Sequence, residues 1–211
     1  MDFREIEEKD PSLQGDWQQV YKMAIPCQVE LDYNTSSQYM QAQEAINFRI
    51  LVHGEESRPW GVRFELTTES DVQFIYQCSV PHEDYMGIQM DNDLSVDFDG
   101  FVGMVKQLLQ DCVSNPSVYQ TLFTMENDDG CAFFRFFHNS EYRKSQILQL
   151  TFKQLDDDEV NQMISYRIKA AEKMRDKIAA RIQDINEIVK KAVSAASEEQ
   201  GLDFDASALL Q

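Results

Sequence analysis

Apolar and polar residues alternate through much of the first 155 residues, a pattern that indicates half-buried strands. In the segment "WGVRFELTT", for example, Val62, Phe64 and Leu66 fall on one face. Segments of this kind are expected to form strands at 20–33, 44–54, 60–68, 72–80 and 117–126, with a short extended piece at 93–101. The spacing predicts a sheet that is mainly antiparallel.

The last pair of apolar runs, "FFRFFHNSEYRKSQILQLTF" at 133–152, reads as a hairpin with a polar tip. An aromatic residue, Tyr142, stands at this tip between Glu141 and Arg143. A ring at that place can reach no core of its own. It either folds onto the neighbouring strands or contacts another molecule.

One helix is expected inside this region. The stretch "FVGMVKQLLQDC" carries apolar residues at helical spacing, with Asp97 or Asp99 as its cap and Asn115 and Pro116 at its end. The apolar positions are Phe101, Val105, Leu108, Leu109 and Cys112. The fold class is therefore α+β: a small antiparallel β-sandwich or barrel head with a short helical insert.

The composition changes after residue 156. Residues 157–200 contain no Gly or Pro and predict one long C-terminal helix with a heptad of apolar residues. The seam consists of Ile168, Ala171, Arg175, Ile178, Ile182, Ile185, Val189, Ala192 and Ala196. Arg175 is its one charged residue. A seam this narrow favours a parallel coiled-coil dimer over a helix that packs back on its own sheet.

These patterns divide the chain into four parts. Residues 1–16 are expected to be a flexible acidic leader, 17–156 the globular head, 157–200 the dimeric coiled coil and 201–211 a flexible tail.

Charge and cysteine content narrow the classes of partner and the compartment that we expect. A formal net charge of −18 and a pI of about 4.4 disfavour nucleic acid and anionic membrane surfaces as partners. The four cysteines form no CxxC pair, which is typical of reduced thiols in a cytoplasmic protein. No segment reaches the length of about 18 apolar residues that a membrane span requires.

The sequence shows no catalytic signature. "PHEDY" brings His82, Glu83 and Asp84 together, but a single histidine in an acidic turn is more often a solvated loop. The acidic run at 90–99 lacks the Gly and Glu spacing of a calcium loop and fits helix capping better. We therefore expect no enzyme activity, catalytic residues, cofactor or bound metal.

Segment 74–112, "FIYQCSVPHEDYMGIQMDNDLSVDFDGFVGMVKQLLQDC", resembles the most characteristic stretch of the spindle assembly abnormal protein 6 family. "ILQLTFKQL" is similar to the last strand before the stalk of that family, and the likeness covers roughly residues 20–200. The resemblance implies a structural protein of the cytoskeleton at the centriole or basal body. Its partners would be itself and other centriolar or basal-body proteins.

In that family, the tip of the last hairpin carries an aromatic residue that enters an apolar pocket on a neighbouring head. By position, Tyr142 matches it, so the resemblance assigns Tyr142, Glu141 and Arg143 to a contact between heads. The family pattern at the tip is Asn-Pro-Phe, and this chain has Glu141 and Tyr142 in place of the last two residues. The substitutions give the ring a hydroxyl to satisfy and make the tip less rigid.

Two hypotheses of different class follow. The first is a self-assembling protein of the centriolar cartwheel, which dimerises through its rod and joins neighbouring dimers through its heads. The alternative is an adaptor of the related end-joining DNA-repair family, and the strong negative charge counts against it.

Overall fold

The structure of the chain is a computed structural model that describes residues 10–32, 40–126 and 130–200. The tail expected at 201–211 and the first nine residues of the expected leader lie outside the described residues. The chain divides into two compact units, residues 1–164 and 165–211.

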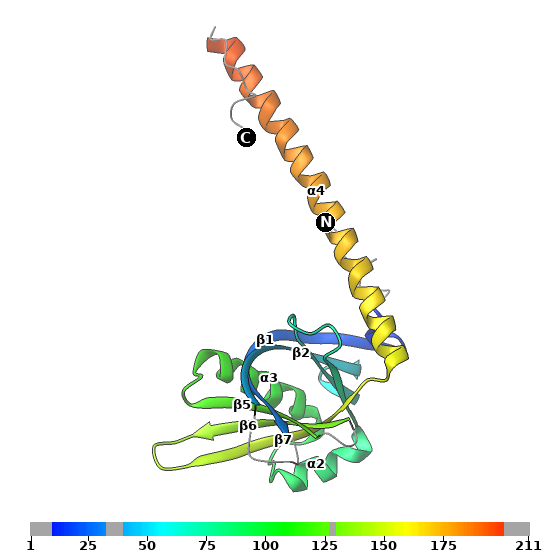
Figure 1. Cartoon of the computed structure of the whole chain (residues 1–211), viewed down its shortest axis with the longest axis vertical. Coiled ribbons are helices and arrows are strands. Elements are labelled where there is room, and N and C mark those ends of the chain that lie inside the picture. Colours follow the sequence, from blue (N-terminus) through cyan, green and yellow to red (C-terminus); the bar gives the residue numbers. More distant parts are fainter. Residues whose placement is uncertain (1–9, 33–39, 127–129, 201–211) are drawn as a thin grey trace. The chain divides into compact units, whose positions relative to one another are not determined.

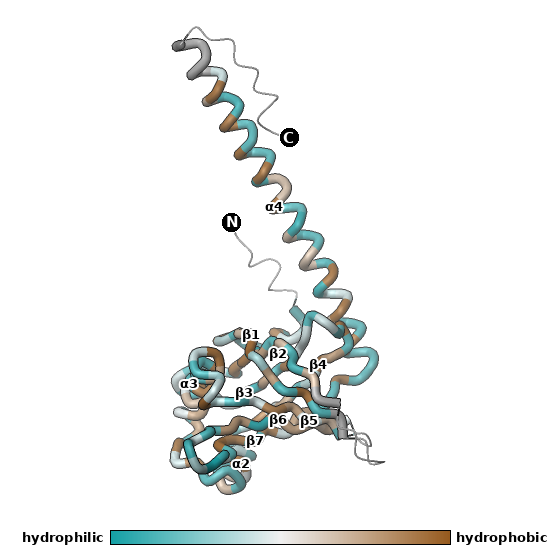
Figure 2. Tube along the Cα trace, turned by 60° about the vertical axis from the view of Figure 1, so that its left-hand side comes forward, coloured by the Kyte–Doolittle hydropathy of each residue, from teal (hydrophilic) through white to brown (hydrophobic). Residues whose placement is uncertain are grey.

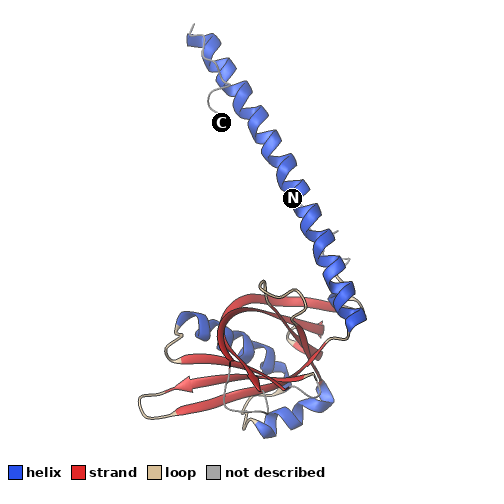
Figure 3. Cartoon of the chain, viewed as in Figure 1, coloured by secondary structure: helices blue, strands red, loops and turns tan. Residues whose placement is uncertain are grey.

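Seven strands of the first unit close into a barrel (Figures 1 and 3), in the order β1-β2-β3-β4-β7-β6-β5. The strands are β1 (Trp17–Asp32), β2 (Met40–Glu55), β3 (Arg58–Thr67), β4 (Ile75–Pro81), β5 (Tyr119–Glu126), β6 (Cys131–Asn139) and β7 (Lys144–Gln154). Neighbours pair antiparallel, except that β1 and β5 pair in parallel at the closure, with Gln28 opposite Leu122. The antiparallel head expected from the sequence is confirmed, and it is a barrel rather than a sandwich.

Phenylalanine fills the barrel, because alternating strands send every second side chain inward. Phe48 lies at the centre of this packing, with its ring centroid 5.7 Å from Phe64 and 5.3 Å from Phe134. The phenylalanines that are fully buried are Phe48, Phe64, Phe101, Phe123, Phe134, Phe136 and Phe152. Strands far apart in the sequence are thereby held by one aromatic core.

Helix α3 (Phe98–Ser114) begins where the sequence indicates. Asp97 is its N-cap, and its carboxylate accepts a hydrogen bond from the Gly100 N–H at 2.9 Å. All five apolar positions of the expected stripe are buried, and α3 packs against β1, β3 and β5.

A second short helix, α2 (Tyr85–Asp91), follows the 3-10 turn η2 (His82–Asp84). Tyr85 anchors α2, because its ring packs on Phe98 and Phe101 and its hydroxyl donates to the Val96 carbonyl at 2.8 Å. The extended piece expected at 93–101 is not a strand. A turn with a positive φ of 51° at Asp93 and the start of α3 occupy that segment instead.

The N-terminal segment is packed from residue 10 onward, unlike the loose leader expected through residue 16. Asp10 caps the 3-10 helix η1 (Pro11–Leu13) and forms a buried ion pair with Arg49 at 2.8 Å. Arg49 also pairs with Glu65 at 3.1 Å. The charge of Arg49 on β2 thus attaches the segment to the barrel wall.

Helix α4 (Asp157–Gln200) has the limits that the absence of Gly and Pro indicates. In its first turns, Val160 and Met163 form a small apolar cluster with Ile75 of β4. The long helix expected from the sequence is present as one helix. None of the helices in the described residues is both long and apolar enough to cross a membrane.

Candidate self-assembly surfaces

The tip of the β6–β7 hairpin is a four-residue turn, Ser140 to Arg143. The Ser140 N–H donates to the Arg143 carbonyl at 2.8 Å, and the Arg143 N–H donates to the Ser140 hydroxyl at 3.1 Å. These bonds close the turn directly after the last strand pair, Asn139 with Lys144. The tip is therefore defined by its own hydrogen bonds.

Tyr142 is the most exposed large apolar side chain among the described residues, at 89% of its full accessible area. Glu141 and Arg143 beside it are exposed as well. No aromatic ring or cation of the described residues packs on the Tyr142 ring. Of the two possibilities that the sequence leaves open, folding back onto the strands is not the one that the structure shows.

The hairpin that carries Tyr142 is anchored in the core. Phe134 and Phe136 of β6 and Phe152 of β7 are buried, and Lys144 lies over the outer ring of Phe137 at 4.4 Å. The far end of the hairpin projects beyond the barrel (Figure 1). Because the hairpin is already ordered, a contact made through the Tyr142 ring would cost little further chain entropy.

A hollow of about 230 Å³ lies where β4 and β7 separate. These strands pair only at Tyr76–Gln154 and Gln77–Lys153. Beyond that point Asn92, at the end of α2, is hydrogen-bonded to Gln149 of β7. The hollow is lined by Cys78, Ser79, Val80, Ile88, Asp91, Asn92, Gln146, Gln149 and Thr151.

The second candidate surface is the seam of α4. Its larger members, Ile168, Ile178, Ile182, Ile185 and Val189, are each about half exposed in the single chain. Ala171, Arg175 and Ala192 are exposed as well, whereas the side chain of Ala196 lies outside the described ones. Apolar residues recur between polar ones along the coloured part of α4 (Figure 2). This stripe has no partner among the described residues of unit 165–211.

Arg175 turns to its neighbour in the chain. Its Nε and Nη2 donate to the Asp176 carboxylate at 3.0 and 2.9 Å, and this hydrogen bonding raises the pKa of the Arg175 guanidinium. Asp176 thus pairs with the one charged residue of the expected seam. The charge nevertheless stands at a seam position.

His82, Glu83 and Asp84 do not form a metal site. Within the described ranges, no three His, Cys, Asp or Glu side chains come together as metal ligands would. Sequence reasoning missed the hollow, because it depends on the short helix α2, whose two turns interrupted by Gly87 give only a weak periodic signal.

Comparison with known proteins identifies a family that matches this chain. The model of the family described as centriolar protein SAS N-terminal domain matches residues 19–152. A search of curated proteins finds no match.

Solved structures share the fold at low sequence identity. An N-terminal fragment of Leishmania SAS-6 with part of its coiled coil is 17% identical, with a TM-score of 0.66, covering 82% of this chain and 98% of that one. An N-terminal coiled-coil dimer of C. elegans SAS-6 is 16% identical, with a TM-score of 0.61, covering 78% and 94%. Since the family model spans well over half of the sequence, the chain belongs to the centriolar protein SAS N-terminal domain family.

Proposed function

We propose that this chain is a self-assembling structural protein of the centriolar or basal-body cartwheel, in which the rod pairs two chains and the hairpin tip joins neighbouring heads. The observation that carries the proposal is Tyr142, an aromatic ring that is 89% exposed at the tip of an anchored hairpin in a member of a centriolar family. Exposure of a large ring on a rigid support is typical of an interface anchor.

The hollow between β4 and β7 is the site that we assign to the incoming Tyr142. Val80, Ile88 and Cys78 give it an apolar floor, and Gln146 and Gln149 on its rim can accept the tyrosine hydroxyl. A volume of about 230 Å³ leaves room for one aromatic ring.

The tip and the hollow are close together along the chain, since β7 begins at Lys144, directly after the tip, and reaches the rim of the hollow at Gln146. Two heads can therefore exchange tips in a self-complementary contact, in which each head gives a ring and receives one. Burial of each of the two rings is worth on the order of 2 kcal/mol, and together they face an association cost of several kcal/mol. A single head contact is expected to be weak, between micromolar and millimolar.

The rod supplies the second contact. A parallel dimer would bury Ile168, Ala171, Arg175, Ile178, Ile182, Ile185, Val189 and Ala192. The Leishmania and C. elegans structures named above each carry part of a coiled coil, and the C. elegans structure is described as a dimer. Two separate self-contacts propagate an assembly, which is a ring if the angle between them closes and a curved filament if it does not.

The end-joining adaptor considered from the sequence is not favoured, because the matching family is the centriolar one. A structural role rather than an enzymatic one fits a chain of this centriolar family. We place the chain in the cytoplasm, on the cytoskeleton, with other centriolar or basal-body proteins as further partners.

Microscopy tests the proposed function. The tagged chain should accumulate at centrioles or basal bodies, and Tyr142→Glu should reduce that signal. Val72→Glu is a matched control, because it places the same charge at an exposed apolar position that belongs to neither surface. Absence of the wild-type chain from these structures would overturn the proposal, and so would equal loss of signal in the two variants.

A further inference from the structure

Trp60 is held in an exposed position by the backbone around it. It stands on β3 with 72% of its area exposed, while Pro59 before it and Gly61 after it are buried. Its ring lies edge-to-face with His53 at 5.7 Å, and His53 in turn contacts Trp17 at 5.6 Å.

The neighbouring backbone leaves space for this ring. Gly54 has a φ of 97°, and a Cβ built there would lie 3.5 Å from the Trp60 ring. The strand register shifts at the same place, between His53 and Gly54. Trp60 is thus a fixed, solvent-facing indole.

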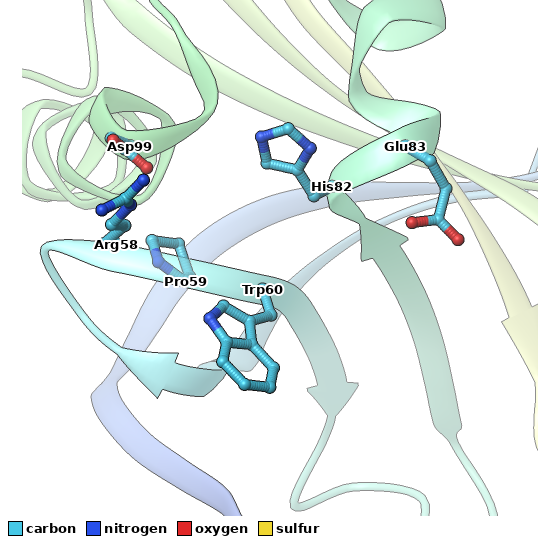
Figure 4. A pocket seen from close by; sticks show the side chains of 6 residues that line it. All are labelled: Arg58, Pro59, Trp60, His82, Glu83 and Asp99. Atoms are coloured by element: carbon cyan, nitrogen blue, oxygen red, sulfur yellow. The ribbon is translucent and has the colours of Figure 1, made fainter.

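A cavity of about 540 Å³ adjoins this ring and has charged walls. Figure 4 shows Arg58 and Asp99 together on one side, with Glu83 across the cavity and its carboxylate turned away from them. No cation of the described residues lies within ion-pair distance of Glu83. An indole and an unpaired carboxylate therefore border the same space.

Apolar surface continues from Glu83 along α2. Met86 and Met90 follow Glu83 at helical spacings of three and seven residues, and they are 68% and 75% exposed. Ile88, which lines the hollow assigned to Tyr142, points to the opposite side of the helix. Methionine side chains adapt to varied aliphatic partners.

The net negative charge indicates what kind of partner would bind this surface. Residues 1–164 hold 29 of the 37 acidic and 11 of the 19 basic residues, so the entire formal net charge of −18 falls on the unit that contains the head. A cationic segment is drawn to such a field, and an arginine or lysine can lie on the Trp60 face while pairing with Glu83. Flanking aliphatic residues would cover Met86 and Met90.

We propose that Trp60, Glu83, Met86 and Met90 form a docking site for a segment of a second protein that carries arginine or lysine between aliphatic residues. The site shares no residue with the hairpin tip, the hollow between β4 and β7, or the rod seam. The site leaves an assembled head with an open surface for a partner of another kind. The proposal does not depend on whether the heads contact each other.

The two tryptophans allow a direct test in the full chain, because each gives one indole N–H signal in a ¹⁵N NMR spectrum and Trp60→Phe assigns them. The probe is acetyl-Leu-Arg-Leu-amide, with the norleucine and glutamate analogues of its central residue as controls. We expect a saturable, salt-sensitive shift of the Trp60 signal with millimolar affinity, while the Trp17 signal stays in place.

The arginine peptide should bind at least about tenfold tighter than the glutamate peptide, and Glu83→Gln should remove most of that preference. No saturable shift of Trp60, or equal binding of the arginine and norleucine peptides, would overturn the proposal. A Trp60 signal that moves on dilution of the protein without any peptide would identify a second copy of the chain as the occupant. That result would also overturn the proposal.

Discussion

Asn92 replaces a missing strand partner for Gln149. Its Oδ1 accepts from the Gln149 N–H at 2.6 Å, while its Nδ2 lies 3.4 Å from the Gln149 carbonyl and 2.9 Å from that of Ile88. One side chain at the end of α2 thus satisfies the edge of β7 where β4 has separated from it. The hollow assigned to Tyr142 depends on this contact, because both Asn92 and Gln149 line it.

Replacement of Asn92 should therefore be costly. Asn92→Ala leaves a backbone N–H of β7 without an acceptor, and we expect a loss of about 1–3 kcal/mol in the free energy of unfolding. Urea denaturation measures this loss. Asn92→Asp keeps the acceptor oxygen and should cost less, whereas equal losses in the two variants would show that the Gln149 N–H is not the group that matters.

Burial of Glu65 predicts a specific pH dependence. Burial raises the pKa of this carboxyl above its ordinary value, although Arg49 opposes the shift. The folded state therefore holds the proton more tightly than the unfolded state. The stabilising contribution is complete below the ordinary pKa and is lost as the pH rises through the raised one.

Glu65→Gln lacks this titration. The stability of the variant relative to wild type should therefore increase between about pH 4 and pH 7, as followed by urea denaturation at several pH values. Glu69→Gln, at an exposed position, is the matched control for the Glu-to-Gln change itself. A relative stability that stays flat or falls with pH for Glu65→Gln would refute the assignment.

Thiol reactivity should separate the four cysteines. Burial raises the pKa of Cys27, Cys78 and Cys112 to about 12, whereas Cys131 on β6 is only half-buried. In native buffer, Ellman's reagent should titrate one thiol rapidly, and all four after denaturation. Cys131→Ser should abolish the rapid phase. Rapid reaction of two or more thiols in the native chain would contradict the burial of the other three cysteines.

The charge at Arg175 should weaken the rod. Two copies of Arg175 would face each other across a parallel seam, and Asp176 on each chain offsets them in part. Arg175→Leu should tighten dimerisation and raise the melting temperature. Lys173→Leu, outside the seam, is the control for added hydrophobicity; a larger effect of Lys173→Leu would mean that the seam is misassigned.

Local patterns predicted the elements whose signals lie within one segment. Asp97 and the stripe from Phe101 to Cys112 gave the limits of α3, and the absence of Gly and Pro gave those of α4. The hairpin and the place of Tyr142 at its tip were equally readable, because alternation and turn residues are properties of neighbouring positions. The sequence left open whether the Tyr142 ring is exposed.

Features that depend on distant residues were not predictable. The parallel pairing of β1 with β5 that closes the barrel joins segments about 90 residues apart. Packing of Asp10 against Arg49 turned part of the expected leader into structure, and α2 exists because Tyr85 reaches Phe98 and Phe101. The hollow and the Trp60 surface follow from these tertiary contacts.

The claim of two independent self-contacts is tested most directly by analytical ultracentrifugation of the full chain from low micromolar to near-millimolar concentration. We expect wild type to be a dimer that forms larger species as concentration rises, and Tyr142→Glu to stop at the dimer. Ile178→Asp should give monomers that associate only weakly, and the double variant should remain monomeric. Larger species in Tyr142→Glu at wild-type levels, or a stable Ile178→Asp dimer at low micromolar concentration, would contradict the account.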